Sequence, residues 1–450
     1  MEYVSTRGDA PVLGFGDVLL TGLASDGGLY VPESWPTLAP EVWAPGRPYA
    51  DIAVDVMWPF VEGSLSRDTL ATMVGEAYAT FDHPAVCPVV PLGDLHLLEL
   101  FWGPTLAFKD VALQMVGRLF DHELTARGER ATIVVATSGD TGSAAIEACV
   151  GRDTLDIVVL HPAGRVSDVQ RRQMTTVDAP NVHNVAIEGT FDDCQDLVKA
   201  LFADVAFRHR VRLSAMNSIN WARVMAQIVY YVSTTAVLGR SSFAVPSGNF
   251  GNVFAGWVAE RMGLPVGQLV IGANSNDILV RWVADGSMVA SEVVPTLSPS
   301  MDIQVSSNHE RLLFELLGRD GPRTAELLQR FRGVGAIEAP RDDRFQAATI
   351  DDATTLATIR RIHDEHGMLV DPHTAVGIAA AVAQRRSLDV PMVAVATAHP
   401  AKFPDAVEQA TGIRPPLPER LADLFEREER FDVLPSDLGT VRAHVLSCTT

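Results

Sequence analysis

The sequence predicts an α/β fold in which parallel sheets are covered on both faces by helices. After residue 88, apolar runs of strand length alternate with amphipathic helical patterns. The runs lack polar alternation, which is typical of strands buried on both faces, and they span residues 131–137, 156–160, 182–189, 242–247, 268–274 and 391–398. Such folds bind ligands in turns just beyond the carboxyl ends of the strands, so the chemistry is expected there.

Residues 1–88 differ in amino-acid composition from the rest of the chain. They are dense in glycine and proline, with aromatic residues scattered between short periodic stretches. This composition predicts a small, irregular and mostly helical extension. The chain has 450 residues, about three times the usual domain size, so two or three domains are expected.

The net charge and the positions of the cysteines limit the classes of function that the protein can have. The formal net charge is −20, and a field of that sign repels phosphate backbones, which argues against a nucleic-acid partner but allows a small anionic substrate. The four cysteines lie far apart, so we expect free thiols and no metal site. The first ten residues do not resemble a signal peptide, and no apolar run has the length of a membrane span. We therefore expect a cytoplasmic protein without a membrane partner.

The first chemical candidate is Lys109, in the stretch FWGPTLAFKDVALQ. Gly103 and Pro104 end a β-type run, and a helical pattern begins near Phe108. The helix dipole opposes a cation in the first turn, so a lysine between Phe108 and an apolar face has a reason for a lowered pKa. A neutral, desolvated amine is what a Schiff-base lysine requires. The alternative is an ordinary surface lysine.

Two further turns follow strand-like runs and precede helices. TSGDTG, residues 137–142, offers hydroxyl groups and backbone N–H groups to an anion. The alternative is that Asp140 or Thr141 simply caps the next helix. PSGNFGN, residues 246–252, combines two glycines with two asparagines and is typical of a phosphate cradle. Its spacing is that of neither a P-loop nor a dinucleotide fingerprint.

Four more segments place polar residues near strand or helix ends. NSINWAR gathers polar side chains suited to a tetrahedral anion or a carboxylate, namely Asn217, Ser218, Asn220 and Arg223; a helix start with a surface arginine would look the same. Arg165 follows a strand and is a candidate second cation. Thr397 ends the last strand, where its hydroxyl could reach a ring nitrogen or be part of the core. DPHTAVG is typical of a helix start with Asp371 as the N-cap.

Each of these signals is ambiguous alone, but their order is that of fold-type II pyridoxal-phosphate enzymes. More specifically, the chain resembles the threonine synthase family of the longer bacterial and fungal type. The resemblance runs from about residue 3 to past residue 405. It rests on the motifs YVSTRG, SDGGLYVPE, GPTLAFKD, TSGDTG, NSINWAR, PSGNFGN, DPHTA and ATAHPAKF.

The resemblance implies two parallel-type sheets wrapped by helices, with three domains. The expected limits are an extension over residues 1–88, a larger cofactor-binding domain over residues 89–128 and 236–450, and a smaller domain over residues 129–235.

The resemblance also implies roles for individual residues. Lys109, next to Phe108, would carry pyridoxal 5′-phosphate as a Schiff base and move protons. Asp140 would face the cofactor's 3′-oxygen, and Thr397 its pyridine nitrogen. The cofactor phosphate would be held by Gly248, Asn249, Phe250, Gly251 and Asn252. The substrate carboxylate would be bound by Thr137, Ser138 and Thr141, and the substrate phosphate by Asn217, Ser218, Asn220, Arg223 and Arg165.

Two positions depart from the common pattern. Many fold-type II enzymes have asparagine where this chain has Asp140, and an ionised carboxylate would repel a phenolate oxygen. Relatives often have histidine where this chain has Trp102, so any role of that histidine in substrate binding would be missing.

The implied activity is the conversion of O-phospho-L-homoserine and water to L-threonine and phosphate, the last step of threonine biosynthesis. This pyridoxal-phosphate dependent β,γ-replacement would make the protein a carbon–oxygen lyase acting on phosphate, as a monomer or a homodimer. The nearest alternative is another fold-type II lyase, such as a dehydratase or a phospholyase. An alternative from another class is an α/β protein that binds a mononucleotide in the 137–142 and 246–252 turns without a covalent cofactor.

Overall fold

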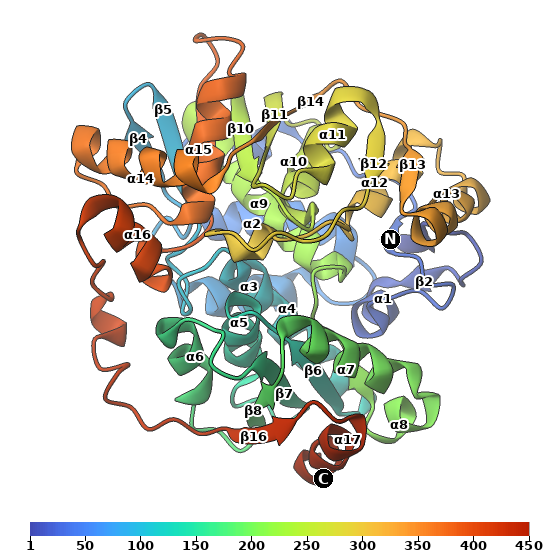
Figure 1. The fold of residues 1–450 in the computed structure, drawn as a ribbon. Coiled ribbons are helices and arrows are strands. Elements are labelled where there is room, and N and C mark those ends of the chain that lie inside the picture. Colours follow the sequence, from blue (N-terminus) through green and yellow to red (C-terminus); the bar gives the residue numbers. More distant parts are fainter. Residues whose placement is uncertain (450) are drawn as a thin grey trace.

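The computed structural model describes residues 1–449 and contains two large sheets with helices packed between and around them (Figure 1). The larger sheet has six strands in the order β14 (Phe345–Thr349), β11 (Val266–Ala273), β10 (Ser241–Pro246), β15 (Met392–Ala396), β5 (Leu95–Glu99) and β4 (Val89–Leu92). All neighbours in it are parallel except β4, which pairs antiparallel with β5. The predicted α/β fold with parallel-type sheets is confirmed.

The smaller sheet has five parallel strands. Their order is β16 (Asp432–Pro435), β8 (Val182–Glu188), β7 (Leu155–Pro162), β6 (Ala131–Ala136) and β9 (Leu213–Ser214). Every residue of β7 is buried, as expected for an apolar strand covered on both faces. The edge strand β16 comes from residues expected in the larger domain, yet it pairs with β8 (red, near the bottom of Figure 1). The sheet pairing thus corrects that part of the expected division, and the domain limits themselves stay a prediction.

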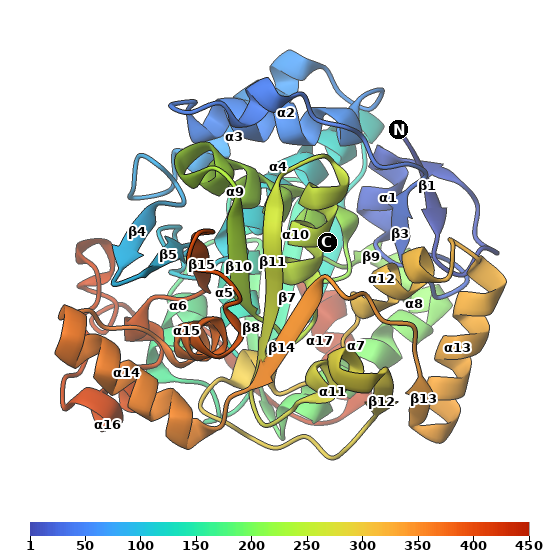
Figure 2. The same cartoon turned by 90° about the horizontal axis from the view of Figure 1, so that it is seen from above.

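The N-terminal extension combines helices with a small sheet. Strands β1 (Glu2–Ser5), β2 (Leu13–Gly14) and β3 (Tyr30–Pro32) form a three-stranded antiparallel sheet. Helices α1 (Phe15–Thr21), α2 (Tyr49–Val61) and α3 (Arg67–Tyr78) complete the extension, and α2 and α3 run along one side of the molecule in the view from above (Figure 2). The expectation of a mostly helical segment holds, and the sheet is an addition to it.

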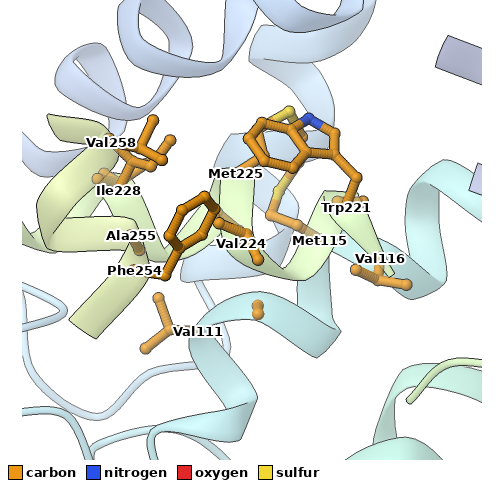
Figure 3. Close-up of a cluster of buried hydrophobic side chains, with 14 of the residues drawn as sticks. Val111, Met115, Val116, Trp221, Val224, Met225, Ile228, Phe254, Ala255 and Val258 are labelled. Atoms are coloured by element: carbon orange, nitrogen blue, oxygen red, sulfur yellow. The ribbon is translucent and has the colours of Figure 1, made fainter. Parts of the chain in front are cut away.

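Three helices join the two sheets into one core. Helix α4 (Lys109–Arg127) packs against α9 (Trp221–Leu238), which packs against α10 (Gly251–Arg261). Their facing side chains interdigitate in Figure 3: Val111, Met115 and Val116 from α4, Trp221, Val224, Met225 and Ile228 from α9, and Phe254, Ala255 and Val258 from α10. Because α10 begins shortly after β10, and the residue before α4 donates a hydrogen bond to the carbonyl of Thr397 after β15, this packing fixes two helix N-termini relative to each other near the strand ends.

The remaining helices cover the sheets. Those that follow strands of the smaller sheet are α5 (Asp140–Cys149), α6 (Asp168–Thr175), α7 (Phe191–Ala203), α8 (Val205–Arg210) and α17 (Leu438–Cys448). The others are α11 (Ile278–Asp285), α12 (His309–Leu316), α13 (Gly321–Val334), α14 (Asp352–His366), α15 (Pro372–Gln384) and α16 (Pro404–Thr411), with the short pair β12 (Ser287–Val289) and β13 (Ala336–Glu338). Among residues 1–449, none of the helices combines the length and apolar character of a membrane span.

Candidate active site

One large cavity collects most of the chemical candidates. It has a volume of about 1300 Å³ and receives residues from strand ends and helix starts of both sheets. The expected site residues that line it are Phe108, Lys109, Asp140, Thr141, Asn217, Ser218, Arg223, Gly248, Asn249, Phe250, Gly251, Asn252 and Thr397. Segments separated by almost 290 residues in the sequence therefore meet at one place, which is where an α/β fold binds ligands.

Lys109 is the first residue of α4, and its amine is buried in this cavity. The residue is 7% exposed, and Nζ lies 3.1 Å from Oδ2 of Asp140 and 5.0 Å from the centre of the Phe108 ring. Burial lowers the pKa of the Lys109 amine; Asp140 opposes this, while Lys402 and Arg223 add to it. The predicted direction of the pKa shift is therefore present.

The turn before α4 explains why Lys109 points inward. Asp110 accepts hydrogen bonds from the backbone N–H of Thr105 at 2.8 Å and from its hydroxyl at 2.7 Å. A Cβ at Gly103 would lie 2.4 Å from the Cβ of Asp110, so glycine is required where the chain passes this close. These contacts close the loop tightly and fix the start of α4.

Asp140 carries a charge that the surrounding residues stabilise. Its Oδ1 lies 3.0 Å from Nζ of Lys402 and accepts a hydrogen bond from Nε2 of Gln170 at 2.8 Å. Burial acts to raise the pKa of this carboxyl, but the two lysines and Gln170 outweigh it and hold the pKa below its usual range. The alternative that Asp140 is an N-cap is wrong, because α5 is preceded by Gly139 without a side-chain cap.

The 137–142 turn uses Thr137 for its own shape. The Thr137 hydroxyl accepts hydrogen bonds from the N–H groups of Gly139 and Gly142, both at 2.9 Å. Gly139 has a φ of 136° and its Cβ would lie 2.5 Å from Gln170, so the turn needs a glycine there. Of the described residues in this turn, Asp140 and Thr141 line the cavity, whereas Thr137 and Ser138 do not.

The glycine-rich loop leads from β10 into the N-terminus of α10. Phe250 has a φ of 65°, and a Cβ at Gly248 would lie 2.9 Å from the carbonyl oxygen of Ser300. Asn252 accepts hydrogen bonds from the hydroxyls of Tyr230 and Tyr231 at 2.6 and 2.8 Å. Within the described chain, its buried Nδ2 has no hydrogen-bond partner. The loop thus offers free donors and the positive end of a helix to an anion.

Arg223 projects into the cavity from the first turn of α9. It is 4% exposed, and its Nη1 donates a 3.4 Å hydrogen bond to the carbonyl of Met216. Its Nε has no partner among residues 1–449, and no carboxylate of these residues forms an ion pair with it. Burial lowers the pKa of Arg223 to about 10, so the guanidinium is charged at neutral pH. A buried cation without a counter-ion is a site for an anionic ligand.

Among the described residues, two further expected substrate contacts, Asn220 and Arg165, do not line the cavity. Asn220 caps α9 by accepting from the N–H of Ala222 at 3.1 Å and donates to the carbonyl of Leu19 at 2.8 Å, so its side chain is used by the fold. Arg165 is exposed and is not among the described residues that line the cavity. Following a strand did not bring it to the site; the chain turns directly after β7, where the N–H of Arg165 donates to the carbonyl of Pro162 at 3.3 Å.

Thr397 lines the cavity, whereas Trp102, just before the Lys109 helix, has a different environment. Thr397 directly follows β15, is buried, and its carbonyl accepts from the N–H of Phe108 at 2.8 Å. This contact ties the end of the strand to the start of α4. Trp102 donates to Oε2 of Glu99 at 2.9 Å and does not line the cavity within residues 1–449.

Three polar side chains at the site had not been assigned from the sequence. Lys402 and Gln170 contact Asp140 from two other segments. His373 lines the cavity, pairs with Asp371 at 2.7 Å through Nδ1, and accepts from the N–H of Ser300 at 3.2 Å through Nε2. DPHTAVG is a helix start capped by Asp371, as predicted. Lys402 lies in the ATAHPAKF motif, but its burial could not be seen there.

Comparison with known proteins assigns the chain to a family. Residues 2–78 match the family described as threonine synthase N terminus, residues 374–445 match threonine synthase, C-terminal, and residues 92–398 match pyridoxal-phosphate dependent enzyme. Among curated relatives, the threonine synthase of Pseudomonas aeruginosa is 55% identical over 99% of this chain and 98% of its own length. That of Saccharomyces cerevisiae is 39% identical over 97% of this chain and 92% of its own length.

Solved structures give the same assignment. The pyridoxal-phosphate bound threonine synthase of Brucella melitensis is 50% identical, covers 100% of this chain and 99% of its own, and superposes with a TM-score of 0.97. The yeast threonine synthase is 35% identical, covers 99% and 98%, and has a TM-score of 0.94. The catalytic-type cavity and these likenesses over the full chain lead to one conclusion: the chain belongs to the threonine synthase family of pyridoxal-phosphate dependent enzymes.

Proposed function

We propose that this protein converts O-phospho-L-homoserine and water to L-threonine and inorganic phosphate. The observation that carries the proposal is the presence of two buried groups in one cavity, the amine of Lys109 and the guanidinium of Arg223, which has no carboxylate partner among residues 1–449. The first group suits covalent chemistry at an amino acid, and the second suits a phosphate. The family assignment supports the same reaction.

The residues present fit pyridoxal phosphate. Lys109 supplies a desolvated amine for the aldehyde, the start of α10 with the free Nδ2 of Asn252 suits the phosphate, and Thr397 would present a hydroxyl to the ring nitrogen. The ionised Asp140 would lie near the 3′-oxygen, with Lys402 compensating its charge. When bound, the cofactor supplies an electron sink for carbanions formed on the substrate.

Lys109 would move protons at its Nζ atom. Its lowered pKa keeps a larger fraction of the amine neutral at physiological pH than an exposed lysine has, so it can accept a proton from a substrate carbon. Asp140 at 3.1 Å stabilises the resulting ammonium and holds it in place. The same atom would then return the proton, as general acid–base catalysis requires.

Arg223 would bind the substrate phosphate and stabilise it as it leaves. Burial excludes water around the guanidinium, so its charge acts on an anion in a low dielectric. Asn217 and Ser218 line the cavity from the preceding loop, and we assign them to the same phosphate. Thr141 lines the cavity beside Asp140 and would face the substrate carboxylate.

The test is a joint measurement of both products. The purified protein, loaded with pyridoxal phosphate and given O-phospho-L-homoserine, is expected to form threonine and phosphate in equal amounts. A phospholyase would instead release phosphate together with a keto acid and ammonia. Phosphate release without threonine would refute the proposal.

We also propose the finer points of organisation. The charge and the small substrate suit a cytoplasmic enzyme without a nucleic-acid partner, acting as a monomer or a homodimer. The three domains would be the extension, the larger cofactor-binding part and the smaller part, with β16 added to the smaller part. Sedimentation of the full chain at several concentrations gives the oligomeric state.

A further inference from the structure

Lysine is rare in this chain. Of its 36 basic residues, arginine accounts for 33 and lysine for three, namely Lys109, Lys199 and Lys402. Lys199 is on the surface, with a side chain that is 69% exposed and paired with Asp196. The other two lysines both contact the carboxylate of Asp140 from opposite oxygens. Two of the three lysines therefore lie at one buried carboxylate, and the remaining basic residues, apart from Lys199, are arginines.

Lys402 is completely buried and has acceptors for all of its N–H groups. Its Nζ donates hydrogen bonds to the carbonyl of Thr105 at 2.7 Å and to Oε1 of Gln173 at 2.9 Å, and lies 3.0 Å from Oδ1 of Asp140. An ammonium has three donors and no acceptor, so these three oxygens match the charged form. A guanidinium is planar and larger and does not have this three-way geometry.

Lys109 has to exist both with and without its proton, and Asp140 is its partner in either state. If Asp140 had Lys109 as its sole counter-ion, loss of the proton would leave an ionised carboxylate buried without compensation, which is costly. The other charged or titratable groups that face this cluster are Arg223 and His373 from the cavity, with Asp110 and His399 behind Thr105 and Lys402. Among residues 1–449, none of these four forms a hydrogen bond or an ion pair with the carboxylate of Asp140.

We propose that Lys402 is a positioning residue for Lys109: its ammonium and the Asp140 carboxylate form a constant ion pair, so that Lys109 can release its proton without leaving a buried carboxylate unpaired. The inference rests on the proposed function only in taking Lys109 as the reacting amine. Its charge balance is simple, because the proton leaves Nζ of Lys109 for a substrate carbon or solvent while Asp140 and Lys402 keep their charges.

The electrostatics of the cluster agree with this arrangement. Burial is the main cause that lowers the pKa of Lys109, and Lys402 lowers it further through repulsion. The same Lys402 charge helps to hold the pKa of Asp140 down. The Lys402 ammonium thus favours the neutral amine of Lys109 directly, and it keeps Asp140 ionised whether or not Lys109 carries its proton.

The rarity of lysine makes a direct test possible. With lysine labelled by ¹³C at the ε-carbon, the full-length chain gives three side-chain signals, and Lys199 serves as an internal reference. The titration of Lys109 is followed in the chain freed of cofactor, for the wild type and for Lys402→Met. We expect the Lys109 midpoint to rise by about one pH unit or more, a tenfold smaller neutral fraction, while Lys199 does not move.

An unchanged Lys109 midpoint in folded Lys402→Met protein would overturn the proposal. If that variant does not fold, Lys402→Gln replaces it, because the amide keeps N–H donors near Thr105 and Gln173 but carries no charge; the Lys109 midpoint is again expected above that of the wild type, and an equal midpoint would overturn the proposal. In an Asp140→Asn background, which has no carboxylate to leave unpaired, the same Lys402 substitution is expected to shift the Lys109 midpoint less, and an equally large shift would also overturn the proposal. Because this titration needs no turnover, its failure is distinct from failure of the proposed reaction.

Discussion

The cavity contains two buried charges that the chain treats in opposite ways. Asp140 is contacted by Lys109, Lys402 and Gln170, each at 3.1 Å or less. Arg223 has a single 3.4 Å hydrogen bond to a backbone carbonyl and no carboxylate within the described residues. Protein groups balance the charge of Asp140, and we call this part of the cavity the Asp140 pole. The charge of Arg223 has no counter-ion among residues 1–449, and we call that part the Arg223 pole.

This difference distinguishes a buried charge that stabilises the fold from a buried charge that binds a ligand. A buried ion with its own counter-ions is part of the folded state, and removing one partner destabilises it. A buried ion without a counter-ion costs stability, and folded proteins keep such groups where a ligand of opposite charge binds. Stability measurements should therefore respond to the Asp140 pole, and phosphate-dependent kinetics to the Arg223 pole.

The largest effect is expected at Lys109, the proposed reacting amine, which contacts Asp140. Lys109→Ala removes the reacting amine, and threonine formation should fall by at least about 10³-fold, because general acid–base catalysis alone contributes ~10²–10⁴. The variant should stay folded, since Lys402 still compensates Asp140. Product formation and circular dichroism measure the two outcomes. Lys199→Ala is the matched control, and near wild-type turnover of Lys109→Ala would contradict the account.

Arg223→Met tests the pole that is open to ligand. Removing one member of a buried charge pair costs about 2–5 kcal/mol of binding, so kcat/KM for the phosphorylated substrate should fall by roughly 10²–10³-fold. The free energy of unfolding without ligand should stay the same or rise, because an unpaired buried charge is removed. Steady-state kinetics and denaturant unfolding are the measurements. If Arg223→Met lost stability but kept its kcat/KM, Arg223 would be a structural residue, which contradicts its assignment to the substrate phosphate.

Asp140→Asn tests the closed pole through stability and pH. At neutral pH the variant should lose about 3 kcal/mol of unfolding free energy, as expected for a broken buried ion pair. The pKa of Asp140 is lower in the folded than in the unfolded chain, so its contribution is fully present above the unfolded value of 3.8 and is lost as the pH falls below it. Denaturant unfolding at several pH values should show the difference from wild type shrinking below pH 3.8. A constant difference would contradict this sign.

The smallest effect is expected at Arg165, which lies outside both poles. Its side chain is exposed, and exposed charges contribute little, about 0–1 kcal/mol. Arg165→Gln should therefore change kcat/KM by about twofold or less. A loss comparable to that of Arg223→Met would show that the loop after β7 contributes to phosphate binding.

Local patterns predicted much of the fold and part of the site. The strand-like runs and the turns after β6, β10 and β15 are readable because each depends on neighbours in the sequence. Lys109 was found from its place at a strand-to-helix turn. The local pattern could not tell which polar side chains the fold itself uses as hydrogen-bond acceptors, as with Thr137 and Asn220.

Contacts between distant segments could not be predicted in this way. The contact between Lys402 and Thr105 spans 297 positions, and Gln170 reaches Asp140 from the adjacent helix of the smaller sheet. The pairing of β16 with β8 is likewise a long-range contact, and the sequence of a four-residue strand does not predict it. Tertiary packing determines which residues contact a buried charge, and a single sequence motif does not determine tertiary packing.

The most direct test of the central claim is to identify which lysine holds the cofactor. The pyridoxal-phosphate loaded protein is reduced with borohydride, digested, and its peptides are analysed by mass spectrometry. With three lysines in the chain, each one is resolved on a separate peptide. The account predicts a pyridoxyl adduct on Lys109 alone. An adduct on Lys402 or Lys199, or none at all, would contradict it.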